Sequence, residues 1–220
     1  MASSTQPEIQ AAHPMSRGRE GRTAEWVRDH GRAVGVATIA LAALAVGGVA
    51  WRSSERAKER RAEQALFQVQ ATAQAQTGTP AVERDLRGVA ARYPGTSGGA
   101  QAALLLAQSL YDQGRFQDGL AVLGRVKVPG QFATSVKLLS AAGLEGAGRA
   151  GEAARLYEEL SNTPGLVERR RDELRAAAGR AYQLGGDKAS ALRVWRSILA
   201  VGGGTALDEA RVRVGELAGG

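Results

Sequence analysis

The longest apolar run of the chain extends from Ala33 to Trp51 and contains no charged residue. Arg32 precedes this run and Arg52 follows it. As an α-helix that rises about 1.5 Å per residue, the run has a length of roughly 28 Å, close to the ~30 Å hydrocarbon thickness of a bilayer. The pattern therefore predicts one transmembrane helix at 33–51, with a short tail on one side of the membrane and a long polar domain on the other.

A cleaved signal peptide and a buried helix of a soluble domain are the alternatives to a permanent anchor at 33–51. A signal peptide has an apolar core of about 7–15 residues and small residues at its cleavage site, and Gly48, Val49 and Ala50 fit such a site. The length of the run, the 32 residues before it and the charges after it favour the anchor. Cleavage would leave an exported soluble binding module that begins at Trp51.

Beyond Trp51 the apolar positions recur with helical spacing, and the alternation typical of strands is rare. Ala, Leu, Arg, Glu and Gln are abundant in this region, and all of them favour helices. A helix at 102–110, a glycine turn at 111–116 and a second helix at 117–126 form one predicted hairpin. The predicted fold class is all-α.

The predicted hairpin repeats along the chain. Shifts of 34 and then 38 residues bring the turn residue Gly114 onto Gly148 and then Gly186. Each hairpin also carries a small residue on both helices, for close packing, and a large apolar residue one turn after the second small one. The small residues are Ala107, Ala141 and Gly179 on the first helices and Gly119, Ala153 and Ala191 on the second, and the large ones are Leu123, Tyr157 and Trp195. A 34-residue period with these residue types indicates a tetratricopeptide repeat, and a plain antiparallel array of helices with glycine turns is the alternative.

Flanking segments complete the predicted array. A helix at 53–76 continues from the span and pairs with a helix at 81–93 as an atypical first hairpin. A helix at 205–217 closes the other end, with Thr205 as its N-cap. The predicted domains are a disordered tail at 1–24, a juxtamembrane and transmembrane segment at 25–51, and a TPR-like helical repeat domain, an α-solenoid, at 52–218.

The charge pattern argues against nucleic-acid binding. The formal net charge is +7, yet basic and acidic residues are interleaved and no aromatic residues accompany a basic stripe. Interleaved charge along a helix is typical of a solvated face. The acidic pairs Glu158-Glu159 and Asp172-Glu173 receive the same interpretation.

No set of residues predicts catalysis. The chain has no cysteine, which excludes disulfides and thiolate metal sites. His13 and His30 lack the spacing and the partners of a metal site. We find no Ser/His/Asp set and no phosphate loop, and the glycines at 202–204 are interpreted as a flexible link. The sequence predicts a protein that is not an enzyme, with no catalytic residue, metal site or cofactor and no small-molecule substrate.

A tetratricopeptide array presents the first helix of each hairpin along a concave groove. The candidate partner-binding residues of this groove are Gln101, Leu104, Gln108, Tyr111, Glu145, Arg180 and Gln183. Arrays that grip a C-terminal carboxylate use Lys and Asn at the positions of Leu104 and Gln108, so the pattern argues against that clamp. Within the span, the candidate small residues for packing against another membrane helix are Ala37, Ala40, Ala43 and Gly47.

The order of these segments resembles the YfgM-like ancillary subunits of the SecYEG protein translocon. The resemblance runs from Trp26 to Leu217. It is carried by WVRDHGRAVGV at the start of the span, GVAWR at its end, GAQAALLLAQSLYDQGRFQDGLAVL in the first full repeat, GRAYQLGGDKASALRVWRSIL in the last, and the terminal TALDEARVRVGEL.

The resemblance implies a non-enzymatic accessory of protein export in the bacterial inner membrane. Its partners would be translocon subunits, an anchored periplasmic folding factor and newly exported chains. Five Arg or Lys residues lie near each end of the span, so the positive-inside rule leaves its direction open. The resemblance implies that the tail is cytoplasmic and the repeat domain periplasmic. An anchored scaffold for another cell-envelope assembly process is the alternative function.

Overall fold

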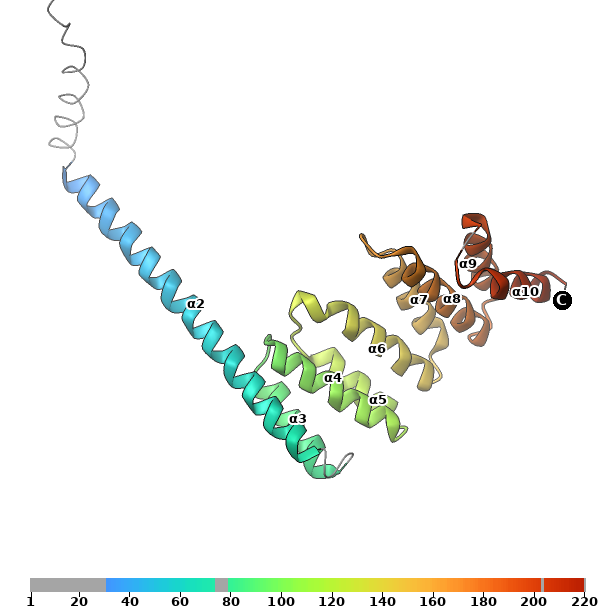
Figure 1. The fold of residues 1–220 in the computed structure, drawn as a ribbon, viewed down its shortest axis with the longest axis horizontal. Helices are drawn as coiled ribbons and strands as arrows, with labels where there is room; N and C mark the ends of the chain where they lie inside the picture. Colours follow the sequence, from blue (N-terminus) through green and yellow to red (C-terminus); the bar gives the residue numbers. More distant parts are fainter. Residues whose placement is uncertain (1–30, 74–78, 203, 220) are drawn as a thin grey trace, which may run out of the picture. The chain divides into compact units, whose positions relative to one another are not determined.

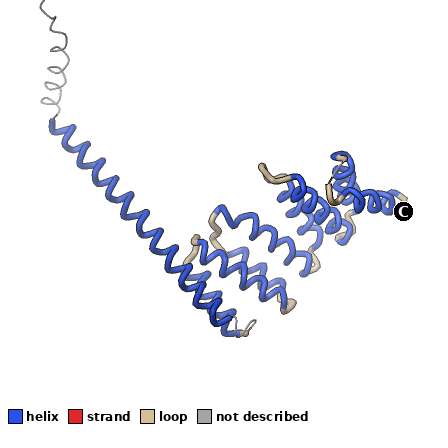
Figure 2. The backbone as a smooth tube through the Cα atoms, viewed as in Figure 1, coloured by secondary structure: helices blue, strands red, loops and turns tan. Residues whose placement is uncertain are grey.

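The structure, a computed structural model, describes residues 31–73, 79–202 and 204–219. Within these ranges the regular elements are all helical, as Figure 2 shows, which confirms the predicted fold class. The chain divides into two compact units, residues 1–55 and residues 56–220. The predicted tail at 1–24, which includes His13, lies outside the described residues, as do Trp26 and His30.

Helix α2 (Gly31–Ala73) is continuous from the predicted span into the first predicted hairpin. Its large apolar side chains in the first unit are exposed, among them Ile39 at 72%, Leu44 at 73% and Trp51 at 67%. The side chains of residues 33–35, 37 and 38 of the predicted span lie outside the described part. Among the residues that are described, we find no helix that combines the length and the apolar character needed to cross a membrane.

Residues 56–220 form helical hairpins in which consecutive helices pack side by side (Figure 1). The 3₁₀ turn Gly130–Phe132 precedes α6. The helices that follow α2 are α3 (Pro80–Arg92), α4 (Ser97–Asp112), α5 (Phe116–Arg125), α6 (Ala133–Gly146), α7 (Ala150–Ser161), α8 (Glu168–Leu184), α9 (Lys188–Val201) and α10 (Leu207–Ala218). Their order confirms the predicted sequence of hairpins and terminal helix.

Local sequence signals explain where several helices begin. Thr79 and Thr96 cap α3 and α4, because their hydroxyls accept hydrogen bonds from the N–H groups of Val82 (3.4 Å) and Gly99 (3.0 Å). Proline follows Thr79 at the first turn of α3, where its missing N–H costs nothing.

The prediction that Thr205 caps the last helix is wrong. Helix α10 begins at Leu207 after Ala206, and no side chain caps it. Ala206 and Ala210 are buried in the core of the last repeat, at 6% and 0% exposed. The start of α10 thus packs against the core through these two alanines.

The three turn glycines have the left-handed conformation that the repeat requires. The φ angles are +74° at Gly114, +74° at Gly148 and +78° at Gly186. Helix α4 extends to Asp112, so the first turn is shorter than the predicted 111–116. The common turn geometry confirms the register that relates the hairpins.

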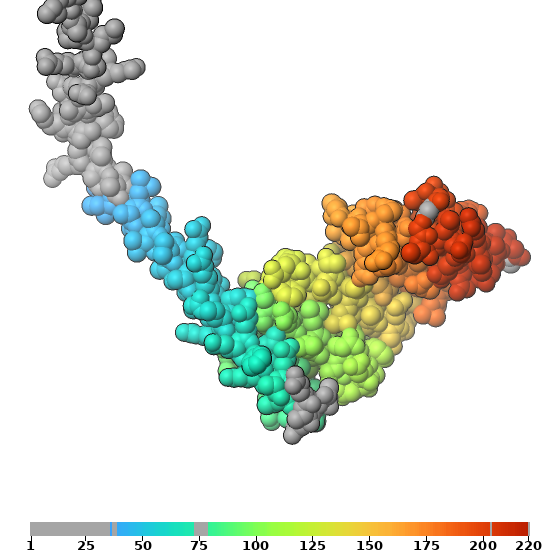
Figure 3. Space-filling model, in the orientation of Figure 1, coloured from blue at the N-terminus to red at the C-terminus, as the bar shows by residue number. Residues whose placement is uncertain are grey.

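The core confirms the predicted pairing of small and large residues. Ala107, Ala141, Ala153 and Ala191 are fully buried, and Trp195 is 0% exposed. A Cβ added to Gly179 would lie 2.6 Å from Cε2 of Trp195, so the absent side chain makes room for the indole. Leu123 and Tyr157 are likewise buried, at 4% and 7% exposed. The buried clusters follow the chain from α2–α4 to α7–α10. Figure 3 shows the surface of the helices that cover them, coloured by residue number.

The prediction that Asp172 lies on a solvated face is wrong. Its side chain is 0% exposed, and neither carboxylate oxygen has a hydrogen-bond partner among the described residues. Arg175 lies nearby, with Nη1 3.8 Å from Oδ1, and Gly204 approaches Oδ2 closely. Burial, with a further contribution from Glu168, raises the pKa of Asp172 above its usual range. The other three acids of the two pairs are at least partly exposed.

Candidate protein-binding surface

The seven predicted groove residues lie on the first helices of three successive hairpins. Helix α4 carries Gln101, Leu104, Gln108 and Tyr111, α6 carries Glu145, and α8 carries Arg180 and Gln183. Helices α4 and α6 are in contact, which brings the first helices of the first two full repeats together. The structure differs from the prediction in how much of each side chain faces solvent.

On α4 the two glutamines are the accessible groups. Gln101 and Gln108 are exposed, and Nε2 of Gln108 donates a hydrogen bond of 2.9 Å to Asp112. Leu104 is half-buried and packs against the small cluster of Ala107, Tyr111 and Leu123. This face therefore offers amide groups beside a partly covered leucine.

Tyr111 is a packing residue with little surface for a partner, since it is 8% exposed. Its ring lies 5.6 Å from the ring of Phe116 and occupies the space that side chains at Gly119 and Gly143 would fill. Its hydroxyl has no hydrogen-bond partner within the described part of the chain. Burial raises the pKa of Tyr111 to about 12.

The remaining predicted groove residues contact the chain itself. The hydroxyl of Tyr157 donates to Glu145 over 3.1 Å, and Nε1 of Trp195 donates to Oε1 of Gln183 over 3.0 Å. Arg180 forms a 2.8 Å ion pair with Glu209 on α10. Glu145 and Gln183 thus satisfy the polar atoms of two core aromatics, and Arg180 joins the last hairpin to the terminal helix.

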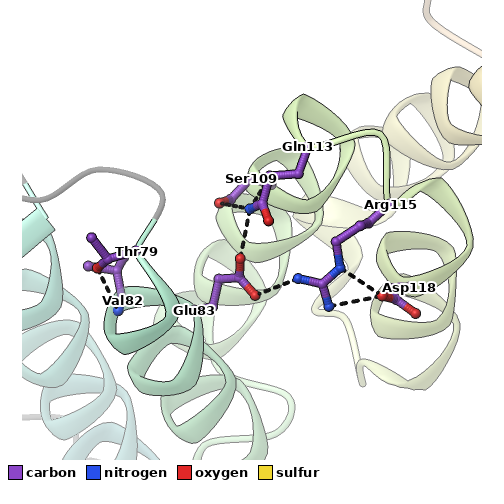
Figure 4. Close-up of polar contacts among 7 residues, drawn as sticks. All are labelled: Thr79, Val82, Glu83, Ser109, Gln113, Arg115 and Asp118. Atoms are coloured by element: carbon purple, nitrogen blue, oxygen red, sulfur yellow. Dashed lines mark hydrogen bonds and ion pairs between the residues drawn. The ribbon is translucent and has the colours of Figure 1, made fainter.

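A buried carboxylate ties the first hairpin to the second, as Figure 4 shows. Glu83 on α3 is 7% exposed and accepts hydrogen bonds from Nε2 of Gln113 (2.7 Å) and Nη1 of Arg115 (3.0 Å). Arg115 also pairs with Asp118 over 2.9 Å. The hydrogen bond from Gln113, followed by Arg115, lowers the pKa of Glu83 despite its burial.

A second polar cluster ties α7 to α9. Glu158 on α7 accepts two hydrogen bonds from Arg193 on α9, at 2.6 and 3.0 Å, and one of 2.9 Å from the hydroxyl of Tyr182 on α8. The guanidinium of Arg193 is the largest cause of the lowered pKa of Glu158. Both ends of the array are thus fastened by a carboxylate that bridges neighbouring hairpins.

The sequence did not single out a groove on the opposite, second-helix side of the first two hairpins. This groove, here the α3–α5 groove, has a volume of about 530 Å³, with α4 as its floor. Leu106 and Leu110 lie in the floor, and Arg87 and Arg125 lie on the walls. An alignment of the repeats could have indicated it: Arg87 follows the buried Leu86 as Glu158 follows the buried Tyr157, so a basic residue occupies the position of an acidic one.

The described side chains offer no group that could hold a metal. Within 31–73, 79–202 and 204–219, no three His, Cys, Asp or Glu side chains lie close enough to bind one ion. The candidate membrane-packing residues Ala40, Ala43 and Gly47 are exposed on α2, and the side chain of Ala37 lies outside the described part. The polar chemistry of the first-helix face is that of amide, guanidinium and carboxylate groups on helices.

The comparison with known families agrees with this architecture. Residues 24–139, just over half of the chain, match the family described as a tetratricopeptide repeat-like domain. The match extends from before the predicted span into α6. No curated protein and no solved structure matches the chain.

Proposed function

We infer a role in protein–protein interaction from the premise that this chain belongs to the family of tetratricopeptide repeat-like domains. Domains of this kind generally act as scaffolds, and their partners are proteins. The observation that carries this role is the row of first helices α4, α6 and α8, whose exposed groups include Gln101 and Gln108. No catalytic set of side chains lies on the described part of these helices, and exposed amide groups suit the recognition of another chain.

We further propose that α2 anchors the array in a membrane through the run at 33–51. Uncharged sequence over nineteen residues and the exposure of Ile39, Leu44 and Trp51 support this proposal, because apolar side chains all around a helix favour a lipid environment. The helix continues without a break into the first hairpin. Such an anchor would hold the binding surface near a membrane complex.

We propose that this complex is the protein-export translocon, as the resemblance to the YfgM-like subunits suggests. The tail would be cytoplasmic and the repeat domain periplasmic, where the array would contact translocon subunits, an anchored folding factor and emerging chains. The second candidate is a scaffold for another envelope assembly process. It is favoured by the mixed chemistry of the first-helix face, which combines amides, a leucine and an arginine and fits no single peptide code.

A reporter fused after Gly220 tests the proposed topology. We expect an enzyme that is active only outside the cytoplasm to be active in this fusion, and a fluorescent protein that needs the cytoplasm to remain dark. The same reporters fused before Met1 serve as the control and should give the reverse result. A fusion after Gly220 that is active only in the cytoplasm would exclude the export role.

Purification of the full chain in mild detergent tests the partners. We expect translocon subunits or an anchored folding factor to be recovered in stoichiometric amounts. Replacing both Gln101 and Gln108 by Glu should reduce this recovery several-fold, whereas Gln117→Glu, an exposed change on α5, should leave it unaltered. Recovery of a different envelope complex with the same dependence on Gln101 and Gln108 would favour the second candidate.

A further inference from the structure

The α3–α5 groove has an apolar floor and a positively charged rim. Ala103, Leu106 and Leu110 of α4 form the floor and are fully buried. The accessible apolar residues are on the walls, at Ala91, Ala121 and Val126. Three arginines line the groove together with one acid, Asp118. The arginines are Arg87, Arg115 and Arg125. Asp118 is already paired with Arg115, so the groove has an excess of positive charge.

The repeat itself shows what closes such a groove elsewhere in the chain. Helices α3 and α7 have the same spacing of inward positions, at Val82, Glu83, Leu86, Val89 and Ala90 in α3. The matching positions in α7 are Ala153, Ala154, Tyr157, Leu160 and Ser161. Leu86 therefore corresponds to Tyr157, and the residue after each, Arg87 or Glu158, occupies the same place on its helix.

Between α7 and α9 this place is used for an internal contact. Glu158 receives both hydrogen bonds of Arg193, which lies two residues before the buried Trp195 of α9. Tyr182, three residues after Gly179 on α8, adds a third hydrogen bond to Glu158. A carboxylate thus joins the two second helices over the helix beneath them.

Between α3 and α5 the same three places hold residues that cannot make this contact. Arg87 occupies the position of Glu158, and Leu110 occupies the position of Tyr182. Ala121 occupies the position of Arg193, because it lies two residues before Leu123 as Arg193 lies two residues before Trp195. Arg87 is exposed, and among the residues that the structure describes it forms no ion pair. The contact that Glu158 makes between α7 and α9 is therefore missing between α3 and α5. The exposed cation Arg87 lines the groove together with the accessible apolar residues Ala91, Ala121 and Val126, while Leu106 and Leu110 are fully buried beneath them.

We propose that the α3–α5 groove binds a segment of a partner protein in which a carboxylate stands beside an apolar side chain. The carboxylate pairs with Arg87 as Glu158 pairs with Arg193, and the apolar side chain packs against Ala91, Ala121 and Val126, the accessible apolar residues of the walls. An ion pair that also carries hydrogen bonds is stronger than a neutral contact and fixes the orientation of the segment. The small, exposed side chains of Ala91 and Ala121 let the segment approach the helices closely.

This site is separate from the first-helix face of the proposed function, and it rests on that function only in taking a protein as the partner. Both surfaces involve α4, but Gln101 and Gln108 do not line the groove and Arg87 does, so substitutions distinguish them. A library of random peptides displayed on phage, selected against the full chain in detergent micelles, serves as the probe. Enriched peptides are then synthesised, labelled and titrated by fluorescence anisotropy.

We expect the enriched peptides to contain Asp or Glu next to Leu, Ile or Phe. Arg87→Glu should weaken their binding by at least about tenfold, the effect of losing one charge-assisted hydrogen bond. The double variant R87E/A121R places a carboxylate and a guanidinium where α7 and α9 carry theirs. It should keep the helical circular dichroism and melting temperature of the parent chain and bind the peptides at least as poorly as R87E.

Arg84→Glu is the matched control, because Arg84 lies on the same helix, is 77% exposed at its side chain and does not line this groove. It should leave peptide affinity unchanged. The proposal is overturned if no peptide is enriched, if the enriched peptides lack acidic residues, or if R87E and R84E have equal effects. Peptides that depend on Gln108 and ignore Arg87 would overturn this groove while supporting the first-helix face. If the chain binds dihexanoyl phosphatidylglycerol more tightly than it binds the peptides, and R87E loses that binding, the groove binds lipid and the proposal is overturned.

Discussion

Small residues determine how closely the helices of each repeat approach. Gly119 and Gly143 leave the space that Tyr111 fills, and Gly179 leaves the space that Trp195 fills. Interiors of proteins are packed about as densely as organic crystals, so one added methyl group at such a position must displace a ring. The pairing of one small and one large residue is therefore the physical content of the repeat pattern.

Gly179→Ala tests this pairing. The new Cβ would lie 2.6 Å from Trp195 Cε2, and we expect the free energy of unfolding to fall by about 1–3 kcal/mol. Gly88→Ala is the control, because nothing lies within 4 Å of a Cβ at that helical position. It should raise the stability by about 0.5–1 kcal/mol through the loss of glycine's unfolded-state freedom. Urea unfolding of the two variants measures the difference, and equal effects would contradict the close packing.

Asp172 gives a prediction for pH dependence. Its folded pKa is raised, so its ionisation opposes folding at pH values above that pKa and ceases to do so below it. Asp172→Asn removes the buried charge, and we expect it to stabilise the fold by about 1–3 kcal/mol at neutral pH. The gain over the parent chain should shrink as the pH falls through the folded pKa. Thermal melts from pH 7 to pH 4 follow this difference, and a gain that is constant with pH would rule the explanation out.

At the scale of elements, hairpins are joined by hydrophobic layers and by a few polar bridges. Leu66 and Val69 of α2 pack with residues of α3 and α4 in one cluster, so the end of the long helix forms half of the first hairpin. Glu83 then links α3 to the turn that follows α4 through Gln113 and Arg115. Exposed ion pairs on single helices, such as Arg211 with Asp208, contribute little by comparison.

Replacing Glu83 by Ala should loosen the first hairpin. Gln113 and Arg115 would lose their common acceptor, and we expect a loss of about 1–3 kcal/mol in unfolding free energy at neutral pH. Because the folded pKa of Glu83 is lowered, chiefly by Gln113, the contribution of Glu83 is present above its ordinary pKa and lost as the pH falls through the folded value. The difference between parent and variant should therefore vanish in acid. Asp85→Ala is the control, because Asp85 belongs to an exposed ion pair in which its carboxylate lies 3.6 Å from Nε of Arg84. This variant should change the free energy of unfolding by less than about 0.5 kcal/mol.

At the scale of the whole molecule, one continuous helix belongs to two units of different character. In residues 36–51 of α2 the described side chains are all exposed, and many of them are large and apolar. After Arg56 the same helix carries a buried stripe that begins at Ala62 and continues through Leu66 and Val69. A helix that is apolar on all sides suits the proposed membrane anchor, and a helix with one apolar face suits packing in the array.

The anchor proposal predicts that charge in the first part of α2 releases the protein from membranes. Leu41→Lys with Leu44→Lys should move the full chain to the soluble fraction, since each lysine costs roughly 2.5–3.5 kcal/mol near the middle of a span. Phe67→Lys is the control, because Phe67 is 71% exposed on the same helix within the repeat unit. Carbonate extraction and flotation of membranes measure the distribution. Retention of the double variant in the membrane, at the level of the control, would argue against the anchor.

Much of the fold was predictable because its signals are local. The turn glycines and the threonine and proline at the start of α3 act within one hairpin, and the 34-residue spacing repeats the same short pattern in the next hairpin. The first-helix face was predictable in position, yet the burial of Tyr111 and the internal hydrogen bonds of Glu145 and Gln183 were not. These features depend on neighbouring hairpins, which place Gly143, Tyr157 and Trp195 against those side chains.

The sequence by itself determined an all-helical repeat, the register of its hairpins and the residues that fill its core, because periodicity and turn chemistry are properties of short segments. Only the tertiary structure showed that Asp172 is buried, that the last helix begins at Leu207, and that the contact of Glu158 with Arg193 has no counterpart beside Arg87 in the described part of the chain. Each of these depends on what packs against a residue from elsewhere in the chain. Charge and polarity in the sequence record what a side chain can do, and the packing of the hairpins decides which of those contacts it makes.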